Sequence, residues 1–153
     1  MKLSVDEIRG ILPHRYPMLL VDRVNELEPL VSGKGVKAVS YNEPYFQGHF
    51  PSKSVMPGVM VIEALTQLIH IVIASAEEYK SKYVYYGGIS RAKFYGTVTP
   101  GCLLELEVSR KGGISSIAEG GGGMMIFSVK ASAEGGEVFT GDITVLVVEP
   151  DLQ

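Results

Sequence analysis

Residues 59–79 read VMVIEALTQLIHIVIASAEEY, and this stretch decides the fold. Apolar side chains surround most of its circumference, which is typical of a helix buried inside a domain. At 1.5 Å per residue the stretch predicts a helix of roughly 30 Å, begun by Pro57-Gly58. Its polar members are spaced by three and four residues, so they share one helix face: Glu63, Thr66, Gln67 and His70.

The segments around this helix have the patterns of β-strands. Leu104, Leu106 and Val108 alternate with polar residues, and residues 127–133 repeat this period of two. Strands are also expected at 19–28, 36–40, 83–90 and 143–148, with a turn from Pro29 to Gly35, a hairpin turn at 134–137 and a break or bulge at Gly120–Gly123. A capping box of Ser4 and Glu7 predicts a short helix over 5–12. These elements predict an α+β fold in which a curved antiparallel sheet wraps the central helix.

Composition narrows the class of protein. The 153 residues suit one domain, and a net charge of −3 gives no basic excess for binding nucleic acid. One cysteine, Cys102, excludes a disulfide framework and a cysteine-based zinc cage, and we expect it to be inert. The N-terminus lacks the features of a signal peptide, and the polar residues in 59–76 argue against a membrane span. We therefore expect a cytoplasmic protein.

Two ionisable side chains are candidates for catalysis. His49 lies in the Pro- and Gly-rich segment 41–58, and an imidazole is the usual general base near neutral pH; the alternative is a structural loop histidine. Glu63 lies one turn into an apolar helix, where burial is expected to raise its pKa and make it a general acid. Alternatively, Glu63 is favoured there by the helix dipole or pairs across a subunit contact. Gln67, four residues on, is placed to orient it.

The remaining candidates are weaker. The backbone N–H of Gly58, at the positive end of the helix dipole, is suited to a developing oxyanion, although many helices begin this way. His14 and His70 are expected to be structural, and three scattered histidines without ligand spacing argue against a metal site.

Several motifs resemble one known family. Residues 12–17 (LPHRYP) with 20–23 (LVDR), 42–51 (NEPYFQGHFP), and 55–67 (VMPGVMVIEALTQ) resemble, in order, the bacterial (3R)-hydroxyacyl-[acyl-carrier-protein] dehydratases. The resemblance implies a hot-dog fold over residues 1–153, dimers with shared active sites and possible trimers of dimers. It further implies that His49 of one chain faces Glu63 of the other and that no cofactor is needed.

The implied reaction is a β-elimination of water from a thioester on an acyl carrier protein. By resemblance, His49 removes the α-proton, the Gly58 N–H stabilises the enolate-like oxygen, and Glu63, oriented by Gln67, protonates the leaving hydroxyl. A glutamate at position 63 resembles the branch that dehydrates without isomerising the double bond. Residues 89–94 (ISRAKF) resemble the strand that lines the acyl tunnel, with Phe94 in its wall, Tyr85 as a gating aromatic, and Arg91 and Lys93 in carrier-protein docking.

The chain departs from the family pattern at Tyr95–Thr97, at Cys102 and at Gly120–Gly123, which bears on carrier-protein docking and pathway. Two other functions compete with dehydration. A hot-dog thioesterase shares the fold and substrate class, but it places a carboxylate as base or nucleophile without needing this histidine loop. A non-catalytic acyl-binding subunit does not explain why both His49 and Glu63 are present.

Overall fold

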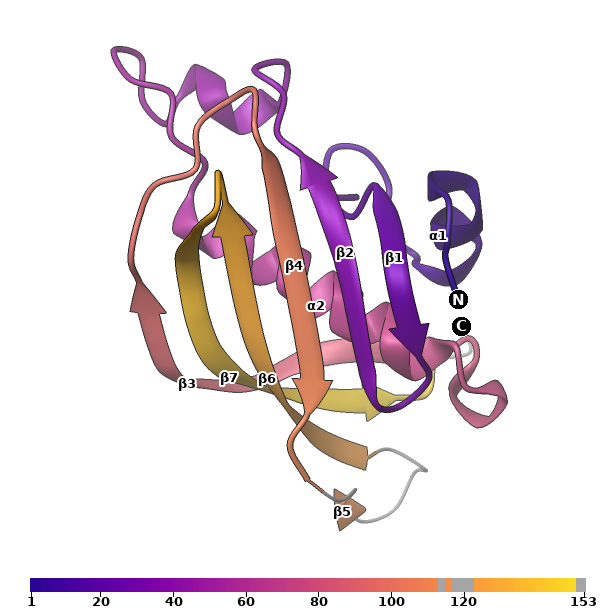
Figure 1. The fold of residues 1–153 in the computed structure, drawn as a ribbon. Helices are drawn as coiled ribbons and strands as arrows, with labels where there is room; N and C mark the ends of the chain where they lie inside the picture. The colour runs from indigo at the N-terminus through magenta and orange to yellow at the C-terminus, as the bar shows by residue number, and fades with distance from the viewer. Residues whose placement is uncertain (113–114, 117–122, 151–153) are drawn as a thin grey trace.

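The computed structural model describes residues 1–112, 115–116 and 123–150 and contains one antiparallel sheet curved around one long helix (Figure 1). The strands run in the order β1-β2-β4-β6-β7-β3, with β5 paired to β6 off this path. Their bounds are β1 Arg23–Glu28, β2 Ser32–Ala38, β3 Tyr83–Phe94, β4 Leu103–Arg110, β5 Ser115–Ser116, β6 Gly123–Ala133 and β7 Gly136–Val148. The helices are α1 Val5–Ile11 and α2 Gly58–Ala74, with short 3-10 turns η1 Pro44–Gln47 and η2 Glu77–Tyr79. The predicted α+β architecture is confirmed.

Helix α2 is the centre of the core. Leu65, Leu68 and Ile69 are fully buried, and they pack in the same apolar cluster as the inward residues of the sheet. Those residues keep the predicted alternation: Leu104, Leu106, Val108, Phe127, Val129 and Ala131. Burying a large aliphatic side chain contributes about 1.5–3 kcal/mol, so each of these residues is a substantial source of stability. Within the described ranges, no helix is long and apolar enough to span a membrane.

Helix α2 is shorter than predicted. It ends at Ala74, where the Ser75 hydroxyl donates to the Ile71 carbonyl at 2.6 Å. Serine competes for backbone groups in this way, and the acidic Glu77 and Glu78 are unfavourable at the negative end of a helix dipole. The expected extension to Tyr79 is therefore only the separate turn η2.

The first hairpin differs from the prediction in where its two strands begin. Strand β1 begins at Arg23 rather than Leu19, and Gly33 and Gly35 lie inside β2 rather than in the turn. A Cβ on Gly33 would lie 2.8 Å from Val72 Cγ2, and one on Gly35 would lie 2.8 Å from the Arg23 carbonyl oxygen. These glycines allow close packing on α2 and β1, a requirement that the sequence pattern does not distinguish from a turn.

The predicted capping box and the predicted hairpin turn are both confirmed. The Glu7 carboxylate accepts hydrogen bonds from the Ser4 backbone and hydroxyl at 2.7 and 2.8 Å, and α1 follows. The hairpin turn between β6 and β7 has positive φ at both Glu134 and Gly135, as the favoured two-residue turn requires. Most of Gly120–Gly123 lies outside the described residues, and Gly123 begins β6.

Candidate active site

The segment that follows β2 places His49. An ion pair anchors its start, because the nearly inaccessible Lys37 lies 2.5 Å from the Glu43 carboxylate just before η1. At its far end, the Met56 N–H donates to the Val98 carbonyl at 2.8 Å. His49 Nδ1 lies 2.7 Å from the Val55 carbonyl oxygen, which can only accept a hydrogen bond. The ring proton is therefore on Nδ1, and Nε2 carries the lone pair that a base needs.

His49 lines a pocket of about 240 Å³ together with Gly58 and Phe94. The pocket lies where α2 begins, and its wall is mainly apolar; the other lining residues are Val55, Met56, Val61, Gly96, Thr97, Val98 and Val138. A Cβ on Gly58 would lie 2.8 Å from the Phe94 ring, so only glycine fits there without moving the ring. The pocket thus combines an imidazole, a helix N-terminus and an apolar wall.

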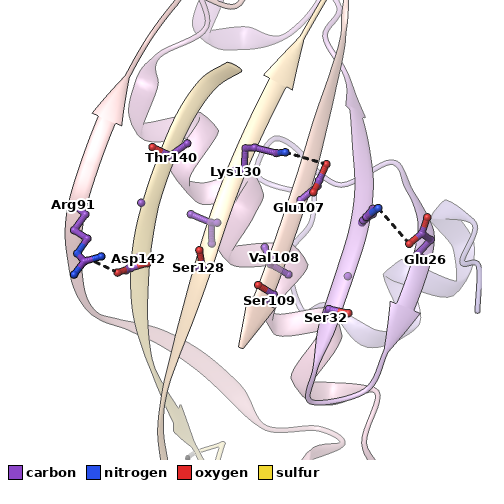
Figure 2. A pocket seen from close by; sticks show the side chains of 14 residues that line it. Glu26, Ser32, Arg91, Glu107, Val108, Ser109, Ser128, Lys130, Thr140 and Asp142 are labelled. Atoms are coloured by element: carbon purple, nitrogen blue, oxygen red, sulfur yellow. Dashed lines mark ion pairs between the residues drawn. The ribbon is translucent and has the colours of Figure 1, made fainter. Parts of the chain in front are cut away.

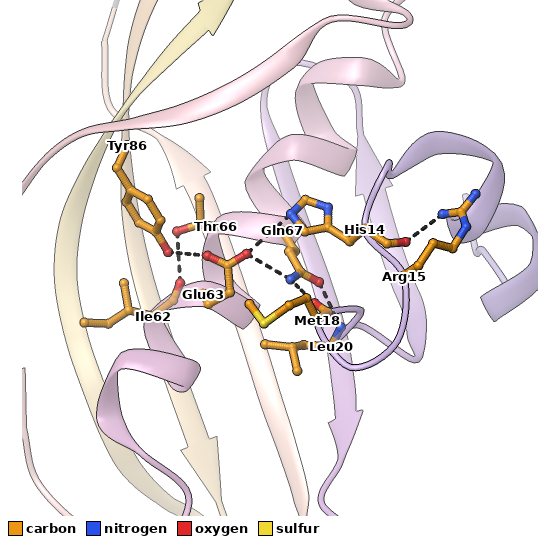
Figure 3. Close-up of polar contacts among 9 residues, drawn as sticks. All are labelled: His14, Arg15, Met18, Leu20, Ile62, Glu63, Thr66, Gln67 and Tyr86. Atoms are coloured by element: carbon orange, nitrogen blue, oxygen red, sulfur yellow. Dashed lines mark hydrogen bonds and ion pairs between the residues drawn. The ribbon is translucent and has the colours of Figure 1, made fainter. Parts of the chain in front are cut away.

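Glu63 lies in a second cluster, on the polar face of α2 (Figure 3). Its Oε1 accepts from Gln67 Nε2 at 3.0 Å and lies 3.4 Å from His14 Nε2. Its Oε2 accepts from the Tyr86 hydroxyl on β3 at 2.7 Å. Gln67 also binds the 13–20 loop, because its amide donates to the Met18 carbonyl and its oxygen accepts from the Leu20 N–H.

The expected rise in the pKa of Glu63 is wrong for this chain. Burial by itself raises the pKa, but hydrogen bonds from His14, Gln67 and Tyr86 and the charge of His14 outweigh it. The net result is a pKa below the ordinary value of 4.5. Sequence reasoning foresaw the burial and the Gln67 contact and missed the other two donors.

His14 and Tyr86 are the residues that sequence reasoning missed. The sequence predicts a structural role for His14, and its partner Glu63 comes from a segment far along the chain. Tyr86 directly follows the proposed gate Tyr85, and neighbours in a strand point to opposite faces. That alternation was the available signal that one of the two tyrosines faces the helix. Tyr85 itself is exposed and stacks on Tyr83 with ring centroids 6.3 Å apart.

His70 is a buried residue of the core, in keeping with the structural role expected for it. Its Nε2 lies 2.9 Å from the Lys82 carbonyl oxygen, while its Nδ1 has no hydrogen-bond partner among the described residues. Desolvation by burial lowers the pKa of His70 to about 4, so the ring is neutral near pH 7. Cys102 is buried, and burial raises the pKa of its thiol.

Arg91 faces a different hollow. A pocket of about 490 Å³ lies on the sheet face turned away from α2 and carries ion pairs between neighbouring strands (Figure 2). Arg91 lies there, 3.9 Å from the Asp142 carboxylate, which Lys111 also contacts at 3.0 Å. Lys93 is exposed on β3 and lines neither this hollow nor the His49 pocket in the described part of the chain.

Within one chain, the two candidate catalytic side chains are not brought together. In the part of the chain that the structure describes, Glu63 is outside the lining of the His49 pocket, and its polar contacts are those of the second cluster. No group of three His, Cys, Asp or Glu side chains among the described residues is arranged to hold a metal ion.

Comparison with known proteins places this fold in a class. The FabA-like domain family matches residues 12–142. The chain therefore belongs to the FabA-like family. It is 55% identical over 108 residues to the 3-hydroxyacyl-[acyl-carrier-protein] dehydratase FabZ of Clostridium novyi, covering 71% of this chain and 76% of the relative. The FabZ dehydratase of Clostridium acetobutylicum is 52% identical over 108 residues, 71% of this chain and 77% of the relative.

Solved structures support the fold alone. The dehydratase heterocomplex ApeI:P from Xenorhabdus doucetiae matches with a TM-score of 0.71 and 18% identity, covering 95% of this chain and 91% of that one. A sigma28-regulated virulence protein from Campylobacter jejuni matches with a TM-score of 0.65 and 17% identity, covering 96% and 90%. The hot-dog architecture is therefore preserved at sequence identities far below those of the FabZ relatives.

Proposed function

We propose that this chain dehydrates (3R)-hydroxyacyl thioesters carried on an acyl carrier protein, giving trans-2-enoyl thioesters. More than half of the aligned residues are identical to those of named FabZ dehydratases, and this similarity is the main support for the proposal. The family match spans His49, Gly58 and Glu63, so the proposed site lies inside the shared region. The protein is an enzyme of the lyase class, and the reaction belongs to fatty acid or related acyl-chain biosynthesis.

His49 is the base in the proposed mechanism. The thioester carbonyl acidifies the α-carbon, and His49 Nε2 takes that proton because Nδ1–H is committed to the Val55 carbonyl. The Gly58 N–H, at the start of α2, stabilises negative charge on the thioester oxygen as the enolate forms. The apolar wall with Phe94 accommodates the adjoining acyl carbons. Gln67, through its bond to Glu63, positions the acid.

Glu63 is the proposed acid. It gives its proton to the β-hydroxyl as the carbon–oxygen bond breaks, and water leaves. Since its three donors favour the carboxylate, a protonated Glu63 requires the incoming substrate to alter this cluster. Replacing the Tyr86 hydroxyl at Oε2 by the substrate hydroxyl is the simplest such change. With glutamate at this position, we propose dehydration without isomerisation.

A second copy of the chain completes the proposed site. Among the described residues, strand β3 is an end strand of the sheet that pairs only with β7, and it is exposed along almost its whole length. Its exposed apolar side chains include Tyr83, Tyr85, Tyr86, Ile89 and Phe94. A long apolar edge strand exposes unpaired backbone groups and is suited to pairing with another strand. Pairing of two β3 strands in a homodimer would bring His49 of one chain toward Glu63 of its partner. Trimers of such dimers are the corresponding larger assembly.

The carrier protein is the proposed macromolecular partner. Arg91 and Lys93 lie on β3 next to Phe94 and are candidates for contacting an acidic carrier surface. Arg91 is near Asp142, which offsets part of its charge, so Lys93 is the freer of the two. Tyr85, exposed on the same strand, is the proposed gate of the acyl tunnel.

Mass spectrometry of the carrier-bound thioester tests this function. We expect the wild-type protein to remove one water from a (3R)-hydroxyacyl carrier protein and His49→Ala to leave it intact. Release of free carrier thiol would identify a thioesterase instead. Binding of the thioester without any mass change would identify an acyl-binding subunit.

A further inference from the structure

The two oxygens of Glu63 have different surroundings. Oε1 is near two nitrogen donors, Gln67 Nε2 at 3.0 Å and His14 Nε2 at 3.4 Å. Oε2 receives only the hydroxyl of Tyr86, at 2.7 Å, among the described residues. With His14 presenting its Nε2–H and Gln67 its amide N–H, neither nitrogen can accept a hydrogen bond, whereas a phenol oxygen can both donate and accept. The proton of a neutral Glu63 is therefore favoured on Oε2.

His14 is the donor in this cluster that is able to carry a charge. The Gln67 amide is neutral, and the 13–20 loop uses its remaining hydrogen-bonding groups at Met18 and Leu20. The Arg15 side chain fixes the backbone around His14, because its Nη1 donates hydrogen bonds to the carbonyls of Leu12 and His14 at 2.8 and 2.6 Å. The His14 imidazole therefore lies next to Glu63 on a loop that these hydrogen bonds hold in place.

The groups around the pair favour an interaction of His14 with Glu63. His70, from α2, lies edge-on to the His14 ring at 6.0 Å and is neutral near pH 7. Tyr86, from β3, is a neutral phenol whose pKa burial raises. Among the described residues, Glu63 is the one carboxylate within ion-pair distance of His14, and both side chains are largely buried. Buried charge-assisted hydrogen bonds are about twice as strong as neutral ones.

We propose that His14 is a positioning residue that stabilises the Glu63 carboxylate formed when Oε2 releases its proton to the departing hydroxyl. This inference rests on the proposed dehydration. The Oε2–H bond breaks as the proton joins the leaving oxygen, which takes the electrons of its bond to carbon and departs as water. His49 receives the α-proton, and that proton is exchanged through water to restore Glu63. His14 and Gln67 hold Oε1 throughout, so the carboxyl does not rotate.

The test compares two variants of His14 in the intact protein. His14→Phe keeps a flat ring and removes the N–H donor, and His14→Gln keeps a neutral donor. The pKa of Glu63 is followed by carbon-13 NMR of labelled glutamate, with Glu63→Gln assigning the signal. Steady-state dehydration of a (3R)-hydroxyacyl carrier protein is measured alongside. His14→Leu is the second donor-free variant if the phenyl ring prevents folding, which circular dichroism reports.

We expect the donor-free variant to raise the pKa of Glu63 and to lower kcat about tenfold or more with little change in KM. His14→Gln should recover part of both effects. An unchanged pKa of Glu63 in a folded donor-free variant overturns the proposal, because His14 then does not stabilise the carboxylate. A raised pKa with unchanged kcat overturns its role in the reaction. Absence of dehydration by the wild type rejects the proposed function itself, and the carboxyl titration separately decides whether His14 holds Glu63.

Discussion

At the scale of single residues, hydrogen-bond partners decide what each titratable group can do. His49 has one backbone partner on Nδ1, which leaves Nε2 as a base. Glu63 has three donors, which favour its ionised form although it is largely buried. A histidine or a glutamate with other hydrogen-bond partners would have a different pKa and a different preferred protonation state. The contacts of each residue therefore matter as much as its type.

Gly58 is predicted to be intolerant even of alanine. The added methyl group would lie 2.8 Å from the Phe94 ring, and overpacking of this kind costs about 1–3 kcal/mol. Urea unfolding of Gly58→Ala should show the lower midpoint. Gly58→Ala combined with Phe94→Leu makes room for the methyl group and should recover most of the loss. An unchanged midpoint in the single variant would mean that the ring moves freely.

His70 is predicted to make stability depend on pH. Its pKa is 6.5 when unfolded and about 4 in the folded chain, so the unfolded state binds the proton first as pH falls. Its contribution is complete above pH 6.5 and is lost progressively as pH falls toward 4, about 3 kcal/mol in all. Glu63 contributes little between pH 6.5 and 5, because its pKa is 4.5 or lower in both states.

Urea unfolding between pH 7 and 5 measures this dependence. The free energy of unfolding should fall with pH in the wild type and change less in His70→Leu, whatever the absolute stability of the variant. Equal slopes in the two proteins would show that His70 does not take up the proton.

At the scale of elements, β3 is the strand whose surface is least explained by a single chain. It carries exposed aromatic and aliphatic side chains along an edge that pairs with no strand in the described part of the chain. The other end of the sheet, β1, is short and contacts the N-terminal segment through the Leu3–Val24 bridge. Short or covered edges resist further pairing, and long exposed ones favour it. The two ends of this sheet therefore differ in how readily each would pair with a further strand.

Ile89→Lys is predicted to weaken association through β3. A lysine on this half-exposed position places charge in the proposed interface, where desolvating it is unfavourable. Light scattering should give a smaller mass for the variant, and dehydration should fall with it. Val31→Lys is the matched control, because Val31 is similarly exposed but lies in the turn between β1 and β2. A variant that keeps the wild-type mass would exclude β3 as the main contact.

At the scale of the whole molecule, the separation of the His49 pocket from the Glu63 cluster predicts complementation between inactive chains. His49→Ala and Glu63→Gln should each be inactive as pure proteins. A mixed dimer has one site with both wild-type residues, and random mixing makes half of the dimers mixed, so activity should return to about a quarter of the wild type.

Mixing the two variants after reversible dissociation, or co-expressing them, provides the measurement. The double variant His49→Ala/Glu63→Gln mixed with wild type is the control, because its mixed dimers contain no intact shared site. Only the wild-type dimers, about a quarter of the total, stay active, so the mixture should retain about a quarter of the activity instead of the half that sites within single chains would give. Mixtures of the single variants that stay inactive despite forming mixed dimers would exclude a site shared between chains.

Periodicity in the sequence was sufficient for the architecture. The apolar stretch after Pro57-Gly58 determined a buried central helix, and the alternation in residues 104–108 and 127–133 determined strands that cover it, because these patterns follow from local backbone geometry. The same reasoning singled out His49, Glu63 and Gln67, since an imidazole in a rigid loop and a polar face on an apolar helix are visible locally.

Only the tertiary structure decided how these groups behave. It placed His14 and Tyr86 on Glu63 from distant segments, reversed the expected direction of its pKa shift, and turned Gly33 and Gly35 from turn residues into packing sites. Each outcome depends on atoms far apart in the chain that become neighbours after folding. Hydrogen bonding, desolvation and close packing act through space, so local sequence patterns do not contain them.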